Sequence, residues 1–592
     1  MKKHLIYLLA AIFFLSLAKP LQAQTATEDY RQNNEKLSTI LQLMKFAYVD
    51  TVKLEKYTEK AIVEMLKELD PHSTYISKEE VQRTNEPLVG NFEGVGVQFQ
   101  IIKDTIVVAA VINGGPSEKV GIMAGDKFLK VDTAIATGKH INNKWVFDRL
   151  RGTKGTEVNL SILRRGQANP LEFRIIRDKI PINSIDVYFM VEPEIGYIKL
   201  DRFAQTTMEE FSVALNDLKI KGMKHLILDL RGNSGGYLNV AIQLSDEFLD
   251  KNKLIVYTEG ANAPIQRFSS TEKGSFKKGR LLVLIDEGSA SASEIVSGAV
   301  QDWDRGLIMG RRSFGKGLVQ KPYNLNDGSI VRFTTSRYHT PTGRSIQKPY
   351  DDGVEEYYKD LARRRDHKEL ISADSIKFPD SLQYKTPAGR IVYGGGGIMP
   401  DIFVPIDTTR TSPFYSRLAR AGLFNQFTME MLGEKREELK KQYPNFEDFR
   451  NNFKVDKNMM SEFIDFAAKE GVVDSLEFNF AAEMKFFLEE NKDSINKLYT
   501  SVDLVNPQKI QEHIGVMFAK HVENQVNEYM KARENFETEK YISYQIRTLL
   551  ARNLYGISSG LQIWFEVDEM FNQAVETVKD EKLFKKMKIQ HN

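Results

Sequence analysis

The stretch LLVLIDEGSASASE, residues 281–294, holds the pattern that decides the fold around it. Its first five residues, Leu281–Ile285, form a short apolar run typical of a strand buried in a sheet. The small residues after the run permit a tight turn, and Ser293–Val300 can begin a helix because serine is a favoured N-cap. A serine between a strand and a helix lies near backbone N–H groups that can stabilise an oxyanion. Ser291 is therefore a candidate nucleophile, although a tightly packed turn with a serine cap explains the same run equally well.

A lysine between two glycines follows this serine, in the segment Phe314-Gly315-Lys316-Gly317. A serine hydroxyl is a weak nucleophile until a base removes its proton, and none of the nine histidines lies near Ser291 in the sequence. Lysine can be that base only when neutral, so its pKa must fall from ~10.4 toward ~7–8, and burial among apolar side chains shifts it in this direction. We therefore predict Lys316 as the base, with Gln320 placed to orient its amine by hydrogen bonding.

A second glycine-rich turn follows a predicted strand at Leu226–Leu230. The turn reads Arg231-Gly232-Asn233-Ser234-Gly235-Gly236 and precedes a predicted helix. A strand that runs into two glycines before a helix presents free backbone N–H groups, so the turn can supply an oxyanion-hole partner for Ser291. An ordinary strand-to-helix connection has the same pattern, and the turn by itself does not separate the two interpretations.

Other kinds of site find little support in the sequence. The segment from Gly310 to Lys316 fits the phosphate-loop pattern GxxxxGK, but Gly317 stands where that loop needs Ser or Thr to hold magnesium, so nucleotide binding is not expected. The chain has no cysteine, which excludes disulfides and thiolate metal sites. Its histidines are isolated, and we expect no metal and no cofactor. The net charge of +2 gives no electrostatic case for binding nucleic acid.

The N-terminus has the pattern of a secretory signal peptide. Lys2 and Lys3 precede an apolar segment at residues 5–18, and a small residue, Ala23, stands at the expected cleavage site. The apolar segment is shorter than the ~20 residues of a membrane-spanning helix. We therefore assign residues 1–23 to a cleaved signal peptide and expect an exported protein, with an uncleaved membrane anchor as the alternative.

Four further regions differ in their patterns. Residues 24–88 space their apolar side chains as a helix does, and residues 89–178 read as a small β-rich module with glycine-rich turns. Residues 179–408 alternate predicted strands and helices, which indicates an α/β domain, and the charged stretch Lys359–Glu369 within it is expected to be a solvated insertion. Residues 409–592 look helical, with apolar stripes typical of a helix bundle.

Together these segments resemble the C-terminal processing peptidases, the tail-specific serine peptidases of family S41. The run SASASE and the segment FGKG each match a motif of that family. The resemblance implies that Ser291 is the nucleophile and Lys316 the base of a Ser–Lys dyad, with Gln320 as the supporting residue. The segment DLRxNxGG at Asp229–Gly236 is a third match.

Further motifs extend the resemblance over roughly residues 40–408. Three segments carry them: Leu69–Tyr75 resembles LDPHSxY, Tyr338–Gln347 resembles YxTPxGRxIQ, and Gly397–Asp401 resembles GIxPD. The DLRxNxGG match implies an oxyanion hole in which the amide of Gly235 or Gly236 joins that of Ala292. The implied fold is multidomain α/β: a ClpP/crotonase-like α/β peptidase core with an inserted β-rich PDZ domain and helical N- and C-terminal regions.

The β-rich module resembles the PDZ domain of this family. PDZ domains bind a peptide by strand addition and hold its terminal carboxylate on backbone N–H groups. The four residues Gly94-Val95-Gly96-Val97 match the loop that holds the carboxylate. The segment Asp132-Thr133-Ala134 departs from the family pattern, in which Asp-Gly is expected. The alternative is a β-module that only packs on the core.

The resemblance implies an exported serine endopeptidase, periplasmic rather than secreted, that captures unstructured protein C-terminal tails and cleaves peptide bonds through an acyl-enzyme. The helical extension after residue 408 can mediate self-association, bind an adaptor or cover the active site. Two other functions remain open: a non-catalytic peptide-binding scaffold on the same fold, and a hydrolase of small-molecule esters or amides that uses the same dyad. The intact dyad argues against the first, and the PDZ-like module argues against the second.

Overall fold

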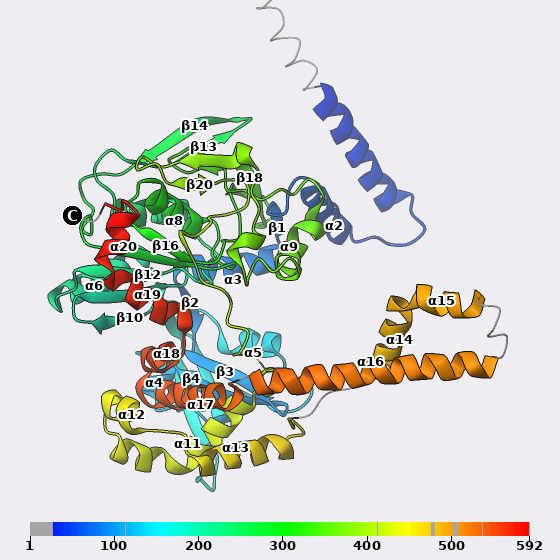
Figure 1. Cartoon of the computed structure of the whole chain (residues 1–592), viewed down its shortest axis with the longest axis vertical. Coiled ribbons are helices and arrows are strands. Elements are labelled where there is room, and N and C mark those ends of the chain that lie inside the picture. Colours follow the sequence, from blue (N-terminus) through cyan, green and yellow to red (C-terminus); the bar gives the residue numbers. More distant parts are fainter. Residues whose placement is uncertain are drawn as a thin grey trace, which may run out of the picture. The chain divides into compact units, whose positions relative to one another are not determined.

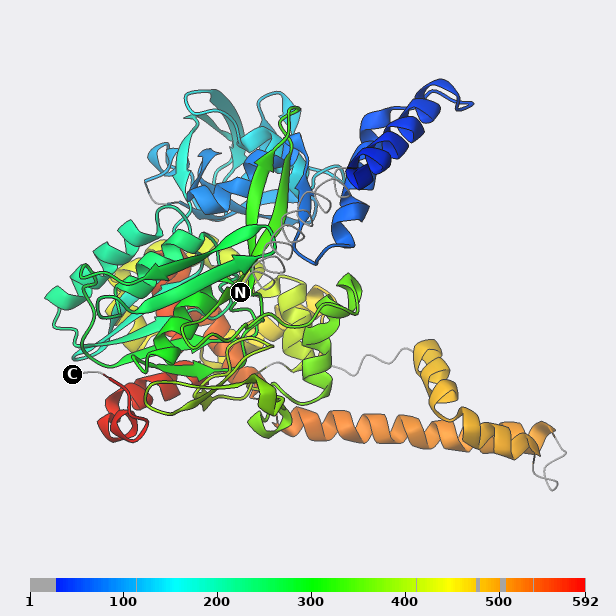
Figure 2. The ribbon, with the colours of Figure 1, turned by 90° about the horizontal axis from the view of Figure 1, so that it is seen from above.

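The computed structural model of the 592-residue chain describes residues 28–112, 114–410, 412–474, 480–500, 507–535 and 537–590. The predicted signal peptide, residues 1–23, lies outside these ranges. The chain forms two compact units. The first runs to Val81 and also includes residues 320–335 and 350–358, and the second contains the remaining segments. Figures 1 and 2 show the chain in two views.

The first unit combines helices with a short pair of antiparallel strands. Its elements are a helix at residues 28–46, α2 (Leu54–Lys67), β1 (Thr74–Ile76) and parts of β17 (Leu318–Asn324), β18 (Ile330–His339) and α9 (Val354–Asp366). Strand β1 pairs with the first part of β18, so that Tyr75 lies opposite Val331. The Asp70 side chain accepts hydrogen bonds from the amides of His72 and Ser73 at 2.8 and 2.9 Å. These bonds form the turn that the Asp-Pro dipeptide predicts after α2.

In the second unit, the β-rich module is a six-stranded sheet with the order β3-β4-β5-β7-β8, and β6 pairs with β5. Its elements are β3 (Val97–Ile102), β4 (Thr105–Val111), α4 (Pro116–Lys119), β5 (Lys127–Val131), β6 (Ala134–Ile135), α5 (Asn143–Leu150), β7 (Glu157–Leu163) and β8 (Leu171–Ile176). After α3 (Lys78–Val89), the chain enters the module through β2 (Asn91–Gly94) and leaves it through β9 (Asp178–Pro181). These two strands pair antiparallel, so the module is inserted at one place in the fold.

The α/β domain of the second unit is built on a six-stranded sheet with the order β10-β11-β12-β15-β16-β21. Its strands are β10 (Ile185–Glu192), β11 (Ile195–Leu200), β12 (His225–Asp229), β15 (Leu281–Ile285), β16 (Leu307–Gly310) and β21 (Ile402–Phe403). All pairs are parallel except β10 with β11. Every residue of β15 is fully buried, because helices cover both faces of a parallel sheet. The predicted strand at Leu281–Ile285 is confirmed with its bounds.

The helices α6 (Thr207–Ile220), α7 (Leu238–Asp246) and α8 (Ala292–Asp302) cover one face of this sheet and share an apolar core with it. Two further sets of antiparallel strands lie outside the main sheet. In the first, β13 (Leu254–Gly260) pairs with β14 (Ala263–Ser269) and with the second part of β18, so that Tyr257 lies opposite His339. In the second, β19 (Gln383–Lys385) pairs with β20 (Ile391–Tyr393).

Most of the charged stretch Lys359–Glu369 is exposed, as its composition predicts, but two of its residues are not. It lies largely in α9, and the side chains of Asp360 and Arg364 are buried. The two form an ion pair at 2.9 Å, four residues apart on one face of the helix. The prediction was wrong for these two residues, because a charge with a partner of opposite sign can be buried and composition does not reveal the partner.

The region after residue 408 is helical, as its apolar stripes predict. Its helices are α10 (Pro413–Arg420), α11 (Leu423–Gln442), α12 (Phe446–Asn452), α13 (Lys457–Lys469), α14 (Phe480–Glu490), α15 (Lys492–Thr500), α16 (Pro507–Asn535), α17 (Thr538–Tyr555), α18 (Ile557–Phe565), α19 (Glu569–Lys579) and α20 (Glu581–Lys586). Helices α10–α13 and α17 build an apolar core of their own, to which α18 contributes Ile563. The last segment, from Phe565 to Ile589, packs instead on the second face of the peptidase sheet. Figure 1 shows α19 and α20 beside this sheet.

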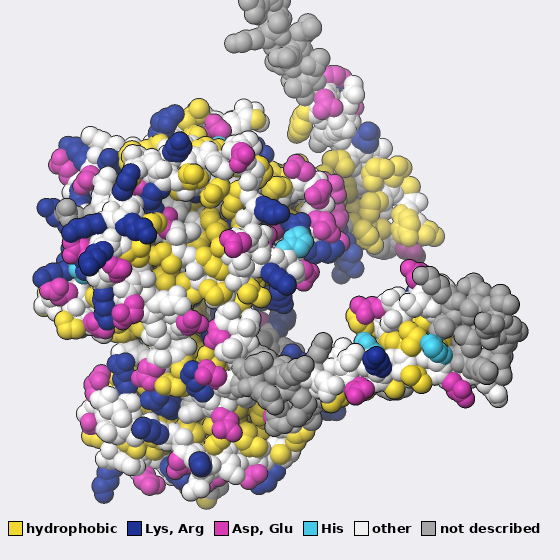
Figure 3. Space-filling model, viewed as in Figure 1, with side chains coloured by type: hydrophobic (Ala, Val, Ile, Leu, Met, Phe, Trp, Pro, Cys, Tyr) yellow, Lys and Arg dark blue, Asp and Glu magenta, His cyan; other side chains and the backbone are white. Residues whose placement is uncertain are grey.

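Charged side chains of both signs are mixed on the described part of the face drawn in Figure 3. The 82 basic and 80 acidic residues of the chain are consistent with this mixture. Within the described part of the chain, no helix combines the length and the apolar character needed to cross a bilayer.

Candidate active site

Ser291 lies between the end of β15 and the start of α8, as predicted. The helix begins at Ala292, so Ser291 itself is the N-cap, and the expectation that Ser293 caps the helix is wrong. The Ser293 hydroxyl donates instead to the carbonyl of Asn233 at 2.8 Å. Ser291 has a φ of 53°, in the left-handed region that non-glycine residues rarely adopt. Such strain is stored where the surroundings hold a residue firmly, which is common at catalytic turns.

Glu294 connects the serine turn to the lysine loop. Its Oε2 atom accepts hydrogen bonds from the backbone amides of Ser291 at 2.8 Å and Lys316 at 2.9 Å. Its Oε1 atom accepts from the Ser313 hydroxyl at 2.5 Å and from the Gly315 amide at 2.7 Å. Four donors from two distant segments therefore converge on one carboxylate, whose side chain is completely buried. The signal in the sequence that could have indicated Glu294 is the spacing S-x-x-E from Ser291, which is that of a capping box.

Burial raises the pKa of the Glu294 carboxyl to about 7, against the hydrogen bonds from Ser313, Lys316, Gly315 and Ser291, which lower it. Removing a carboxylate from water disfavours its charged form, while donors aimed at the oxygens favour it. The two effects oppose each other at this position, and burial is the larger. The carboxyl therefore changes its charge close to neutral pH.

The Tyr338 side chain also connects the serine turn to the lysine loop. Its hydroxyl lies 2.6 Å from the carbonyl oxygen of Lys316 and 3.1 Å from that of Ser291. The side chain is almost fully buried, with 1% of its surface exposed. Ser291 and Lys316 are thus held through their amides by one carboxylate and through their carbonyls by one phenol. Tyr338 comes from the segment that resembles YxTPxGRxIQ, but nothing in that pattern predicts this contact.

The loop that carries Lys316 is supported by the charged residues of α9. The Arg364 guanidinium donates to the carbonyls of Ser313 at 2.8 Å and Phe314 at 3.2 Å. Burial lowers the pKa of Arg364, and the nearby charge of Asp360 opposes that shift. The sequence did not reveal these residues as support for the loop, because their charged surroundings predict exposure to solvent. The spacing of Asp360 and Arg364, four apart on a helix, was the available signal.

The predicted oxyanion-hole turn lies directly against the serine turn. A Cβ atom at Gly235 would lie 2.8 Å from Ser291 Cβ and 3.0 Å from Ala292 N, so only glycine permits this approach. The two turns are also hydrogen bonded, since the amide of Ala290 donates to the carbonyl of Asn233 at 3.0 Å. The Gly235 amide donates to Asn233 Oδ1 at 2.8 Å and so already has a protein acceptor.

Gly236 is constrained by a different neighbour. Its φ is +150°, and a Cβ atom there would lie 2.2 Å from the carbonyl oxygen of Phe203. The amide of the next residue, Tyr237, donates to that same carbonyl at 2.9 Å. The backbone at Gly236 is therefore fixed by the segment that follows β11.

Gln320 belongs to the other compact unit, where it joins the segment that resembles LDPHSxY. Its Nε2 donates to the Thr334 hydroxyl at 3.2 Å, and that hydroxyl donates to Asp70 Oδ1 at 2.9 Å. The Ser73 hydroxyl donates to the second Asp70 oxygen at 2.5 Å. The amide of Gln320 is thus positioned by a chain of hydrogen bonds that ends at the Asp70 turn.

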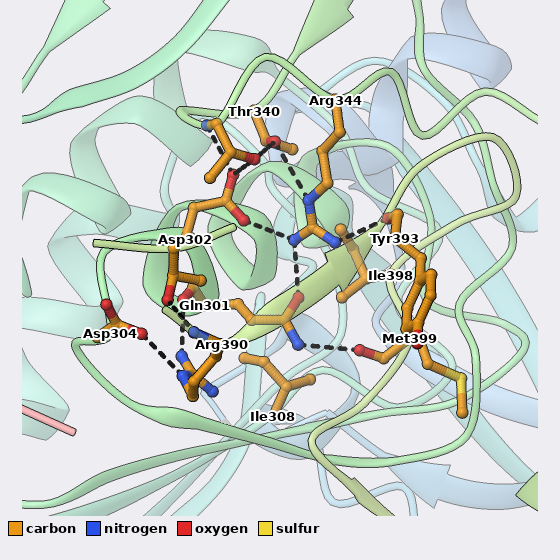
Figure 4. A network of polar contacts seen from close by, with 12 residues as sticks. Gln301, Asp302, Asp304, Ile308, Thr340, Arg344, Arg390, Tyr393, Ile398 and Met399 are labelled. Atoms are coloured by element: carbon orange, nitrogen blue, oxygen red, sulfur yellow. Dashed lines mark hydrogen bonds and ion pairs between the residues drawn. The ribbon is translucent and has the colours of Figure 1, made fainter. Parts of the chain in front are cut away.

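The far end of α8 is fixed by a buried polar network, drawn in Figure 4. The fully buried Arg344 donates to Gln301 Oε1 at 2.7 Å and lies 2.7 Å from Asp302. Arg390 pairs with Asp304 at 2.7 Å and with Asp401 at 2.6 Å. Arg344 and Asp401 belong to the segments that resemble YxTPxGRxIQ and GIxPD. These two motifs therefore hold the C-terminal end of the helix whose N-cap is Ser291.

The residues of the predicted carboxylate loop, Gly94-Val95-Gly96-Val97, connect β2 to β3. Gly96 has a φ of +78°, and the Val95 carbonyl accepts from the amide and hydroxyl of Ser117 at 3.0 and 2.7 Å. Strand β3 is the first strand of its sheet order, with β4 on one side. Helix α5 packs beside it, where the rings of Phe99 and Phe147 lie 5.7 Å apart. An edge strand next to a helix is the arrangement that accepts an added peptide strand.

In the ranges that the structure describes, no group of three or more His, Asp or Glu side chains has the geometry of a metal site. The structure brings the backbones of Ser291 and Lys316 to one carboxylate, at the N-terminus of α8. A hydroxyl, an amine and the backbone N–H groups of a helix N-terminus are the groups that acyl-transfer chemistry uses.

Three family models match the chain. Peptidase family S41 matches residues 194–359, a PDZ domain matches residues 94–175, and a family of unknown function matches residues 414–485. The first match contains Ser291, Lys316 and Gln320. The second contains the loop at residues 94–97.

Known proteins are also similar to this chain. A carboxy-terminal-processing protease of Bartonella bacilliformis is 35% identical over 355 residues, which are 59% of this chain and 81% of that protein. The carboxy-terminal processing protease CtpB of Bacillus subtilis is 33% identical over 350 residues, which are 57% of this chain and 72% of that protein. The solved structure of a photosystem II D1 C-terminal processing protease aligns at 25% identity over 62% of this chain and 87% of that chain, with a TM-score of 0.33.

Proposed function

The chain belongs to peptidase family S41 and is a serine-type carboxy-terminal-processing protease with a PDZ domain, and from this we propose that Ser291 and Lys316 are its catalytic dyad. The observation that carries the proposal is the Glu294 carboxylate, which accepts hydrogen bonds from the amides of both residues. Two segments that are distant in sequence are thereby fixed at one buried group. A nucleophile and its base need such a fixed arrangement, because proton transfer takes place over a hydrogen-bond distance.

In the proposed reaction, Ser291 Oγ attacks the carbonyl carbon of a peptide bond while the neutral Lys316 amine accepts the hydroxyl proton. The lysine ammonium then gives this proton to the amine nitrogen of the leaving peptide, the C–N bond breaks, and an ester to Ser291 remains. The amine next takes a proton from water, which attacks the ester, and Ser291 Oγ leaves as a hydroxyl after recovering that proton. The sequence of steps is that of other serine acyl transferases, with lysine in the role of histidine.

For the oxyanion hole we assign the amides of Ala292 and Gly236. Ala292 is the first residue of α8, and the first N–H groups of a helix have no partner within the helix. Of the two candidate glycines, Gly235 has its amide on Asn233 Oδ1, which favours Gly236 as the donor. That Gln320 orients the Lys316 amine stays a prediction, which rests on the sequence.

The PDZ domain is proposed to select substrates by their C-terminal tails. A tail would add as a strand to the edge of β3, with its terminal carboxylate at Gly94-Val95-Gly96-Val97. The position of β3 at the sheet edge and of α5 beside it supports this assignment. Export to the periplasm is likewise a proposal, which rests on the sequence of residues 1–23.

The test is cleavage of a peptide with a free C-terminal carboxylate by the chain without residues 1–23, with products identified by mass spectrometry. The same peptide with an amidated C-terminus and a small ester serve as comparison substrates. We expect internal cleavage of the free acid and a KM about tenfold higher for the amide, since the amide loses a charge-assisted hydrogen bond.

Other outcomes would contradict the proposal in different ways. Equal KM values for acid and amide would exclude tail recognition. Turnover of the ester without cleavage of any peptide would indicate a small-molecule hydrolase, and binding without turnover would indicate a peptide-binding scaffold.

A further inference from the structure

A residue of the C-terminal region, Asp568, contacts the residue at which the oxyanion-hole turn begins, Arg231. Asp568, between α18 and α19, lies 2.8 Å from the Arg231 guanidinium, and both of its oxygens accept from Nη1 of that arginine. Arg231 is the residue immediately before Gly232 in the turn that leads to Gly235 and Gly236. The two partners are separated by 337 positions in the sequence.

The Arg231 guanidinium also binds a second carboxylate, that of Asp229, through its Nε and Nη2 atoms. Its Nε donates to both oxygens of Asp229 at 3.0 and 2.9 Å, and its Nη2 donates to Asp229 Oδ2 at 2.6 Å. The Tyr197 hydroxyl donates to the same carboxylate at 2.6 Å. Asp229 is completely buried, and only 15% of the Arg231 side chain and 13% of the Asp568 side chain are exposed. The guanidinium is therefore fixed between two carboxylates that water scarcely reaches.

The electrostatics of this cluster depend on both carboxylates. Burial by itself lowers the pKa of Arg231, but the charges of Asp229 and Asp568 outweigh it and raise the pKa above its usual value. Burial likewise raises the pKa of Asp229, and the charges of Arg231 and Lys199 reverse that shift and bring it to about 2. A buried arginine that loses one of two carboxylate partners keeps a donor without an acceptor, which is unfavourable inside a protein.

The apolar surroundings of the cluster come from the same segment of the chain. The Tyr197 ring lies 5.0 Å from the Phe565 ring and 5.2 Å from the Phe571 ring. Phe565 is the last residue of α18, and the Phe571 amide donates to Asp568 Oδ1 at 3.1 Å, so that Asp568 also caps α19. The junction of α18 and α19 thus contributes two aromatic rings that pack against Tyr197 and a carboxylate that pairs with Arg231.

We propose that Asp568 is a positioning residue for the oxyanion-hole turn, so that the end of the C-terminal region is part of the support of the peptidase site. The inference rests on the proposed function, because it assigns the Gly232–Gly236 turn to transition-state stabilisation. Asp568 does not contact the substrate in this account. It acts through Arg231, whose fixed side chain sets the start of the turn.

The test compares Asp568→Asn with wild type in steady-state peptide cleavage. Asparagine is also a good N-cap, so the variant keeps α19 while it removes the charge and one of the two oxygens that accept from Arg231. Oxyanion stabilisation acts in the transition state, so we expect kcat to fall about tenfold while KM stays within about twofold. Asp568→Glu should recover part of kcat, since it restores the charge.

Asp580→Asn is the matched control, because Asp580 caps α20 in the same way, with the Leu583 amide on its Oδ1 at 3.0 Å. We expect this variant to keep the wild-type kcat. If Asp568→Asn has the kcat of wild type, the positioning role is refuted. The proposal is also overturned if Asp568→Asn loses both kcat and Tm and Asp568→Glu does not restore kcat. Asp568 would then have only a structural role.

A second measurement does not depend on activity. Hydrogen–deuterium exchange of the peptide that covers residues 230–237 should become faster in Asp568→Asn and stay unchanged in Asp580→Asn. Unchanged exchange in both variants would contradict the inference. Absence of peptide cleavage by the wild-type protein would instead contradict the proposed function, and the exchange experiment would still decide whether Asp568 holds the turn.

Discussion

The backbone amide of Lys316 donates a hydrogen bond to Glu294 Oε2 at 2.9 Å, across a separation of 22 residues. The amide of Ser291 donates to the same oxygen. The relative position of the proposed nucleophile and base is therefore set by a third residue, which contributes no chemistry of its own. A single buried carboxylate links the turn after β15 to the loop after β16.

Glu294→Gln should weaken both stability and catalysis. The NH2 group of glutamine cannot accept hydrogen bonds, so the two donors on the carboxylate oxygen that it replaces lose their acceptor. At about 1–3 kcal/mol for each buried donor left unpaired, the free energy of unfolding should fall by about 2–5 kcal/mol. Displacement of the dyad should lower kcat about 10- to 100-fold, since small misplacements of reacting groups are costly.

The matched control is Glu210→Gln. The Glu210 carboxylate also accepts from two amides of a distant segment, those of Ser184 at 2.7 Å and Ile185 at 3.0 Å. Urea unfolding should show a loss of stability in both variants, and kinetic assays a loss of kcat only in Glu294→Gln. A similar fall of kcat in both would mean that Glu294 has no special relation to the dyad.

The charge of Glu294 should make stability depend on pH between 4.5 and 7. Burial raises its folded pKa to about 7 from 4.5, so the folded protein keeps a proton that the unfolded chain has already lost in this interval. Stability therefore falls as pH rises, by about 3 kcal/mol over the interval at ~1.36 kcal/mol per unit. Urea unfolding at pH 5 and pH 7.5 measures this slope. Glu294→Gln cannot titrate and should have a smaller slope, whereas equal slopes would show that the carboxyl has its ordinary pKa.

Tyr338→Phe should reduce kcat several-fold and stability by about 1–2 kcal/mol, because the carbonyls of Ser291 and Lys316 lose a buried donor. Tyr555→Phe removes a comparable hydroxyl, which donates to the Tyr443 carbonyl at 2.5 Å within the C-terminal helices. Thermal unfolding and peptide cleavage should show a similar loss of stability in both variants but a lower kcat only in Tyr338→Phe. An unchanged kcat in Tyr338→Phe would argue against a bridging role.

Gly96→Ala should impair the capture of C-terminal tails. The residue has a φ of +78°, and a Cβ atom there would lie 3.1 Å from Ile180 Cδ1, so alanine would shift the loop. The KM for a peptide with a free carboxylate should rise about tenfold. Gly166→Ala is the control, because its φ of +83° carries a similar strain of about 1 kcal/mol with nothing within 4 Å of the added atom. Equal KM values for the two variants would place tail binding elsewhere.

The sequence predicted those parts of the site that depend on local pattern. The apolar run Leu281–Ile285 and the small residues after it predict a strand and a turn, and the structure has both. The helix was predicted to begin at Ser293 and begins at Ala292. The three alternating serines offer equivalent caps, and only the contact of Ser293 with Asn233 distinguishes them.

The residues that position the site were not predictable, because their partners are remote in sequence. Arg364 reads as part of a solvated charged run until its guanidinium is seen on the carbonyls of the lysine loop. Asp568 caps a helix, as many aspartates do, and only the fold brings it to Arg231. Local pattern predicts strands, turns and caps, whereas a buried ion pair depends on which elements pack together.

The most direct test of the central claim is peptide cleavage by the wild-type protein beside Ser291→Ala and Lys316→Ala. Both variants should remain folded, as judged by circular dichroism and Tm. We expect each to lose at least about 1,000-fold in kcat, since either change removes a group that acts as one unit with the other. Cleavage by either variant at the wild-type rate would contradict the assignment of Ser291 and Lys316 as the catalytic dyad.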